Sequence, residues 1–71
     1  MFEQIRDILS KYTEETITTE SAFAADLGLS SFDVVSIVTD FEERFDIEIP
    51  DRDIRRFISV KDVMNYLSEH T

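Results

Sequence analysis

Residues 30–45 read SSFDVVSIVTDFEERF and form the longest amphipathic pattern in this chain. Apolar side chains recur in it at spacings of three and four, which predicts a helix with one buried face. The inward stripe should consist of Val34, Val35, Ile37, Val38, Phe41 and Phe45. Ser30 and Asp33, three residues apart, resemble a capping box with a shorter acid than the usual Glu. We therefore expect the helix to begin at Ser30 or Ser31 and to end before Pro50, because the residue preceding a proline is biased away from helical geometry.

Three other segments also have helical spacing. A first helix is indicated by Phe2, Ile5, Ile8, Leu9 and Tyr12. A short third helix should run from Asp51, as its cap, to Phe57, with Ile54 and Phe57 facing inward. A last helix should open at Ser59, with an acid at its third position, and bury Val60, Val63, Met64 and Leu67. No strand pattern is present, so residues 1–71 are predicted to form one all-α domain, a small four-helix bundle with three main helices.

The stretch from Thr13 to Ser30 interrupts these patterns with Thr, Ser and Glu, and its apolar anchors are Ile17, Phe23, Leu27 and Leu29. Loops of this length are uncommon in compact domains and often accompany a functional site. The only glycine, Gly28, lies near the end of this loop, where a tight approach or a positive φ would require it. We therefore expect a long first loop that packs onto the bundle beside a site.

Composition excludes several classes of protein. The 71 residues carry a net charge of -9, and the segment from Asp26 to Asp51 holds eight acids and one base. Such a chain repels nucleic acids and anionic membranes and attracts basic protein surfaces. No apolar run is long enough to span a bilayer, and the N-terminus lacks a signal-peptide layout. The absence of Cys is compatible with a reducing compartment. We therefore expect a cytoplasmic protein that is not inserted in a membrane.

Enzyme and metal sites are not supported by the residues available. His70 is the only His and lies in a tail that we expect to fray. The segment from Gly28 to Phe32 lacks the second glycine of a nucleophile elbow. The acidic stretch from Asp46 to Asp51 lacks the glycine of a calcium loop. We expect neither catalytic residues nor metal ligands.

The remaining feature is the serine pair that follows Phe23-Ala24-Ala25-Asp26-Leu27-Gly28-Leu29. With Ser31-Phe32-Asp33, Ile49-Pro50-Asp51 and the Ser59 opening of the last helix, this pattern resembles the acyl carrier protein family over most of the chain. The resemblance implies that Ser31 receives phosphopantetheine from coenzyme A, transferred by a separate enzyme. A phosphodiester at a helix N-terminus would meet unpaired N–H groups there. Considered alone, either serine could simply cap the helix.

The resemblance also implies a surface that basic patches on partner enzymes recognise. Its residues would be Phe32, Asp33, Val35, Ser36, Thr39, Asp40, Glu42, Glu43, Glu48 and Asp51. A pocket for the acyl chain would be formed by Phe23, Val35, Val38, Phe41, Ile54 and Phe57. Arg52, Arg55 and Arg56 depart from the commonly acidic third helix of the family. We interpret them as offsetting neighbouring acids, in preference to forming a second docking patch.

The leading function is the presentation of thioester-linked acyl groups on the arm, in fatty acid or related lipid or polyketide synthesis. The partners would be a phosphopantetheinyl transferase and the enzymes that extend or transfer the acyl chain, and the carrier itself would be a monomer. One alternative is a specialised carrier for D-alanine or for a peptide or polyketide pathway, because Ser31-Phe32 resembles the D-alanyl carriers. Another is an unmodified acidic module that binds a basic partner.

Overall fold

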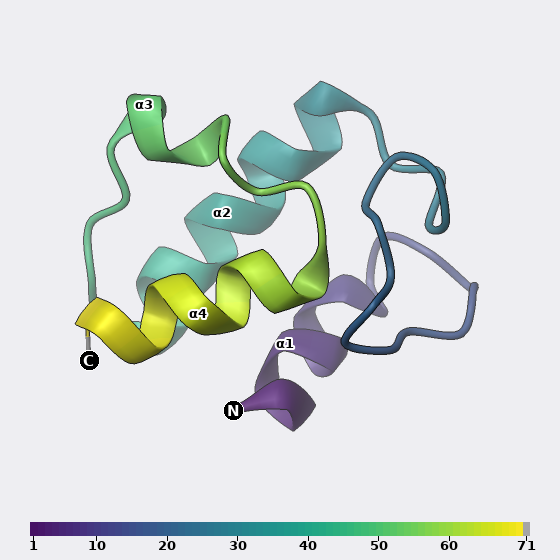
Figure 1. Ribbon diagram of the computed structural model, residues 1–71, viewed down its shortest axis with the longest axis horizontal. Helices are drawn as coiled ribbons and strands as arrows, with labels where there is room; N and C mark the ends of the chain where they lie inside the picture. Colours follow the sequence, from purple (N-terminus) through teal and green to yellow (C-terminus); the bar gives the residue numbers. More distant parts are fainter. Residues whose placement is uncertain (71) are drawn as a thin grey trace.

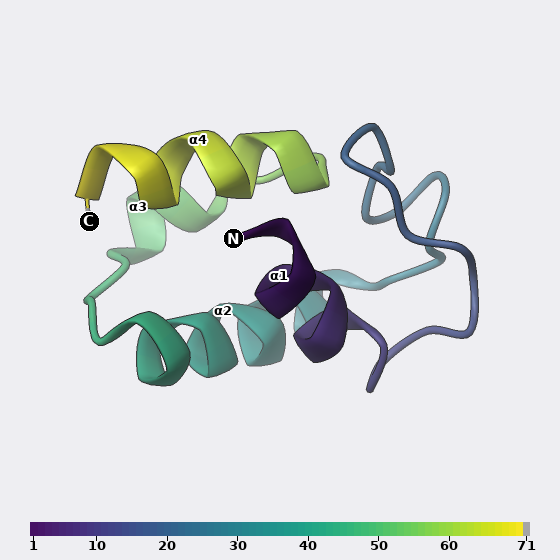
Figure 2. The same ribbon diagram turned by 90° about the horizontal axis from the view of Figure 1, so that it is seen from below.

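The computed structural model describes residues 1–70 and confirms the all-α fold with four helices. The helices are α1 (Phe2–Leu9), α2 (Ser31–Phe45), α3 (Asp51–Ile54) and α4 (Val60–His70). Both long helices, α2 and α4, begin on the side of the first loop, and α3 connects the end of α2 back toward the start of α4 (Figure 1). In Figure 2, α1 lies beside α2, and its N-terminal end points toward the level of α4. The residues described contain no strand, only an isolated bridge between Ala22 and Ser59.

The start and the end of α2 are both fixed locally. The Asp33 N–H donates to Ser30 Oγ, and the Ser30 N–H donates to Asp33 Oδ2, each at 3.1 Å, so the predicted capping box is present. The helix ends at Phe45 because Asp46 adopts the left-handed conformation, with φ 55°. Aspartate tolerates this region better than most residues other than glycine. The helix therefore ends before Pro50, as expected, with its C-cap four residues ahead of that proline.

The hydrophobic core is contributed by α1, α2, α4, the first loop and, on either side of α3, Ile49 and Phe57, whereas α3 itself has no buried residue. On α1, the buried side chains are Ile5, Ile8 and Leu9. The structure corrects the expected inward stripe of α2, because Val35 is 52% exposed. Val35 is displaced by about 100° around the helix from Val34, and this rotation takes it away from the core.

The short third helix differs from the expectation. It ends at Ile54 instead of Phe57, and Pro50, not Asp51, is its N-cap, without a side-chain hydrogen bond. After it, the Arg56 and Phe57 N–H groups donate to the carbonyls three residues earlier, at 3.0 and 3.1 Å. Such tight bonds close a turn without extending an α-helix. Phe57 is buried as expected, and Ile54 is half-buried.

The first loop packs against the start of α4. The Phe23 N–H donates to the Ile58 carbonyl at 2.9 Å, and the Val60 N–H donates to the Ser21 carbonyl at 3.0 Å. Phe23, Leu27 and Leu29 are buried and Ile17 is half-buried, so the predicted anchors are inside. Because these bonds and anchors hold its second half, the loop forms a fixed wall of the bundle next to the beginning of α2 (Figure 1).

The C-terminal residues correct two further expectations. His70 does not form a frayed tail; it is the last residue of α4, and its ring stacks on Tyr66 with centroids 4.0 Å apart. Tyr66 is itself buried, although the predicted inward set for this helix did not include it. Met64, which that set did include, is half-buried. The inward face of α4 is therefore broader than the aliphatic positions alone indicate.

Candidate functional site

The two serines at the start of α2 have different surroundings. Ser30 is the N-cap, and its hydroxyl oxygen accepts the Asp33 N–H. Ser31 is the first residue of the helix and is exposed, and its hydroxyl has no hydrogen-bond partner among residues 1–70. A hydroxyl that is exposed and not required for capping can react without cost to the helix. Ser31 is thus the better placed of the two for covalent modification.

A groove of about 650 Å³ begins at this serine pair. It lies between the second half of the first loop, the first turn of α2, and α3 with the segment that follows it. The lining residues are Ala22, Phe23, Ala24, Ala25, Leu29, Ser30, Ser31, Val34, Val35, Asp51, Ile54, Arg55, Phe57 and Ile58. Most are apolar, and the charged ones are Asp51 and Arg55. An apolar groove beside a free hydroxyl is suited to a flexible group attached to that hydroxyl.

The groove ends against a tightly packed interior. Phe23, Val34 and Phe57 line the groove and also form part of a core region that has no room for a water molecule. The predicted pocket residues are therefore divided between two places. Phe23, Val35, Ile54 and Phe57 line the open groove, whereas Val38 and Phe41 lie with Phe23 and Phe57 in the closed interior.

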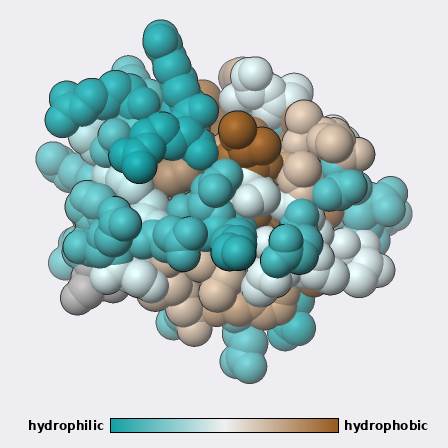
Figure 3. All heavy atoms as spheres, in the orientation of Figure 1, coloured by the Kyte–Doolittle hydropathy of each residue, from teal (hydrophilic) through white to brown (hydrophobic). Residues whose placement is uncertain are grey.

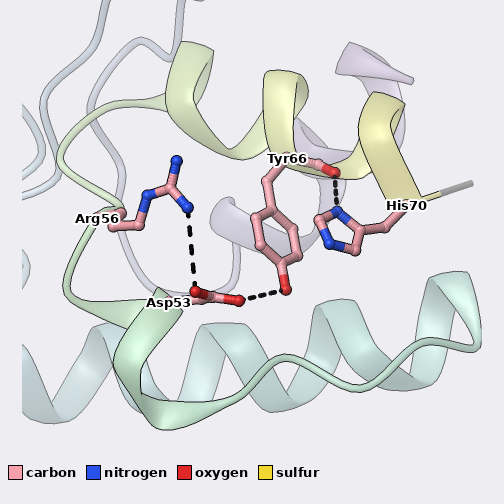
Figure 4. A network of polar contacts seen from close by, with 4 residues as sticks. All are labelled: Asp53, Arg56, Tyr66 and His70. Atoms are coloured by element: carbon pink, nitrogen blue, oxygen red, sulfur yellow. Dashed lines mark hydrogen bonds and ion pairs between the residues drawn. The ribbon is translucent and has the colours of Figure 1, made fainter.

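One hydrogen bond joins α3, which forms one wall of the groove, to α4, and each of its two residues has a further polar contact within its own segment. The Tyr66 hydroxyl donates to Asp53 Oδ2 at 2.9 Å, and Arg56 lies 4.0 Å from the other oxygen of the same carboxylate (Figure 4). His70 Nδ1 lies 2.8 Å from the Tyr66 carbonyl oxygen, in addition to the ring stacking. Burial of the Tyr66 hydroxyl and its bond to Asp53 raise the pKa of this tyrosine. This contact was not predicted from the sequence. It could have been sought because a tyrosine on the inward face of a helix needs a hydrogen-bond partner for its hydroxyl.

The acids expected on the partner-recognition surface are not equally free. Asp33 belongs to the capping box, and Glu42 Oε2 accepts the Ile49 N–H at 2.8 Å. Asp40 Oδ2 accepts the Tyr12 hydroxyl at 2.6 Å, and this bond raises the pKa of Tyr12. These three are half-buried, whereas Glu43, Glu48 and Asp51 are exposed. Of the uncharged members of the surface, Thr39 is exposed and Ser36 is half-buried.

Two exposed apolar side chains flank the site. Phe32, next to Ser31, is 80% exposed, and Ile58, on the rim of the groove, is 68% exposed. On the face shown in Figure 3, hydrophilic side chains gather where Figure 1 places α3, and a strongly hydrophobic area adjoins them. Sequence reasoning did not single out Ile58. Its position could have indicated exposure, because Ile58 is an apolar residue that lies just before the last helix and outside the inward-facing positions of that helix.

The arrangement does not indicate catalysis. Within residues 1–70 no group of three or more His, Cys, Asp or Glu side chains could hold a metal ion. His70 is engaged with Tyr66 and is not among the residues that line the groove. None of the helices in this part of the chain is long and apolar enough to cross a membrane.

Comparison with known proteins adds independent information. Residues 3–67 match the family model described as the phosphopantetheine attachment site. The chain is 40% identical over its full length to the acyl carrier protein of Clostridium perfringens strain SM101, covering 97% of that protein. It is also 40% identical over its full length to the acyl carrier protein of Clostridium acetobutylicum, covering 96% of it.

A solved structure from Mycobacterium tuberculosis, described as a candidate acyl carrier protein, superposes with a TM-score of 0.89 at 28% identity. The alignment covers 99% of this chain and 97% of that one. The residues at the serine pair fit the group that the family model names. An exposed hydroxyl, an adjoining groove with apolar walls and one cationic side chain in that groove provide an attachment atom, room and a counter-charge.

Proposed function

This chain belongs to the acyl carrier protein family, whose members attach phosphopantetheine and are carriers, not enzymes, and we propose that its arm is attached to Ser31. The thiol at the end of the arm forms thioesters with acyl groups. Residues 1–71 act as one carrier domain, as a monomer. The cargo belongs to fatty acid or related lipid or polyketide synthesis, and the chemical steps are performed by the partner enzymes.

The observation that carries this proposal is the contrast between the two serines. The Ser30 hydroxyl is engaged in the capping box, while the Ser31 hydroxyl is exposed, without a partner in residues 1–70, and opens on the groove. The capping box also leaves the backbone geometry of the first turn fixed, so that Ser31 is presented in one position. Attachment at Ser31 therefore leaves the N-terminal cap of α2 intact.

The chain's own residues then have two tasks. The apolar walls formed by Phe23, Val35 and Ile54 exclude water from part of a bound acyl chain. Each methylene that leaves water contributes about 0.8 kcal/mol, so a groove of this size favours an aliphatic cargo over a small polar one. This preference supports an acyl carrier over a D-alanyl carrier. Glu43, Glu48 and Asp51, all exposed, attract the basic surfaces of the transferase and of acyl-handling enzymes.

We also propose a cytoplasmic location. A carrier arm ends in a thiol, and a reducing compartment keeps such a thiol free to form thioesters. The chain itself contributes no cysteine that could form a mixed disulfide with the arm within one molecule.

An intact mass spectrum of the protein purified from its native host tests the function. We expect the mass of one phosphopantetheine arm, carrying an acyl group that hydroxylamine releases. An alanyl group on the arm would instead identify a D-alanyl carrier. A chain without any arm would contradict the proposal and favour the unmodified interaction module.

A further inference from the structure

Three arginines lie in or near α3, and they differ in their surroundings. Arg56 forms an ion pair with Asp53 and does not line the groove. Arg52 is exposed and lies outside the groove, without an ion pair in the part of the chain that is described. Arg55 is also exposed and without an ion pair there, but it lines the same groove as Ser31. Arg55 is therefore the one cationic residue among those lining that groove.

The N-terminus of α2 favours an anion on Ser31, but the carboxylates near Ser31 oppose one. Asp33 lies two residues further along the same turn of α2, with its carboxylate at the N-cap backbone, and Asp51 lines the groove. The whole chain already carries a charge of -9. A phosphodiester on Ser31 adds another negative charge to this acidic neighbourhood, and like charges repel each other. A cation that shares the groove offsets this repulsion, and Arg55 has no competing ion pair among residues 1–70.

We infer that Arg55 binds the phosphodiester that joins the arm to Ser31, an inference that rests on the attachment proposed above. A guanidinium presents several N–H donors in a fixed plane, which suits a tetrahedral phosphate oxygen pair. Arg55 thus positions the base of the arm along the groove in place of letting it extend freely into solvent. This role differs from the partner docking and from the offsetting of neighbouring acids that its sequence position indicates.

Nuclear magnetic resonance of apo and holo protein tests this assignment at low salt. On loading, the Arg55 Nε–H resonance should move while that of Arg52 stays in place. In the holo form, Arg55→Met should shift the ³¹P resonance of the phosphodiester away from its wild-type position. The matched control Arg52→Met, which removes an exposed charge outside the groove, should leave it unchanged. Arg55→Lys, which keeps the charge without the planar donors, should give an intermediate shift. These differences should vanish near 1 M salt, where the screening length is about 3 Å.

Two results would overturn the assignment. One is an Arg55 resonance that is the same in apo and holo protein. The other is a ³¹P shift that is equal in Arg55→Met and Arg52→Met, which would reflect net charge alone. Peptide mass mapping of each sample separates this failure from a failure of the proposed function. An arm found on Ser31 with unmoved resonances overturns only the role of Arg55, whereas an arm absent from Ser31 overturns both.

Discussion

At the scale of single residues, neighbouring side chains of the same type have separate tasks. Ser30 completes the N-terminal cap of α2, and Ser31 keeps a free hydroxyl. The cap could be predicted from the sequence because both of its partners lie within four residues. The groove could not, because Ser31 shares it only through the tertiary fold with residues 22–25 and with Asp51, Ile54, Arg55, Phe57 and Ile58.

Gly28 allows a test at this scale. Its φ is +67°, and a Cβ placed on it would meet nothing within 4 Å. Gly28→Ala should therefore lower the free energy of unfolding by about 1 kcal/mol through backbone strain alone. Gly28→Asn should lose less, because Asn tolerates the left-handed region. Urea unfolding of the three proteins measures both differences, and an alanine variant as stable as the wild type would contradict this account of the loop.

At the scale of elements, two tyrosines connect segments that are distant in the sequence. The Tyr12 hydroxyl bonds Asp40 across 28 residues, and the Tyr66 hydroxyl bonds Asp53 across 13. Helical periodicity identifies which face of a helix is buried, but it does not identify the partner of a hydroxyl group. For the same reason the inward stripe of α2 was predicted except for Val35, and α3 was predicted too long. Its end depends on turn bonds at Arg56 and Phe57 that no periodic pattern encodes.

These tyrosines predict a loss of stability at alkaline pH. The pKa values of Tyr12 and Tyr66 are raised in the folded protein above the ordinary value of about 10. Their contribution is fully present below pH 10 and is lost as the pH rises through the raised folded values. Wild-type stability should therefore fall above about pH 10 more steeply than that of Tyr12→Phe or Tyr66→Phe. Urea unfolding across this pH range measures the slopes, and parallel profiles for all three proteins would contradict the prediction.

At the scale of the whole molecule, we expect the acidic surface to govern association with partner enzymes and the groove to govern binding of the acyl chain. The exposed acids Glu43 and Glu48 belong to the acidic segment, whereas Glu3 and Glu14 are also exposed but lie outside it. Glu43→Lys with Glu48→Lys should slow loading by a basic transferase several-fold, and more at low salt than at high salt. Glu3→Lys with Glu14→Lys makes the same change in net charge and serves as the control. Asp40 is unsuitable for this test because its removal also breaks the bond to Tyr12.

Initial loading rates at several salt concentrations compare the two double variants. Equal rates would mean that net charge alone governs association and that the segment after Ser31 has no special role.

The groove predicts that an acyl chain stabilises the domain. At about 0.8 kcal/mol for each buried methylene, several methylenes are substantial beside a total stability of roughly 5 kcal/mol for so small a domain. The melting temperature should rise from the holo form to a medium-chain acyl form. Ile54→Trp, which fills part of the groove, should reduce this increment, while Phe32→Trp, outside the groove lining, should preserve it.

Calorimetry of the holo and acyl forms measures each increment. Coincident melting curves for the wild-type forms would mean that the chain stays in solvent, and they would favour a carrier of short or polar groups.

The central claim, that Ser31 carries the arm, is tested most directly by transferring phosphopantetheine to three proteins and measuring their intact masses by mass spectrometry. Wild type, Ser30→Ala and Ser31→Ala are incubated with coenzyme A, Mg²⁺ and a broad-specificity phosphopantetheinyl transferase. We predict one added arm on the wild type and on Ser30→Ala, and none on Ser31→Ala. Ser30→Ala should instead lose about 1 kcal/mol of stability through its missing cap, and Ser31→Ala should not. An arm found on Ser31→Ala would contradict the account.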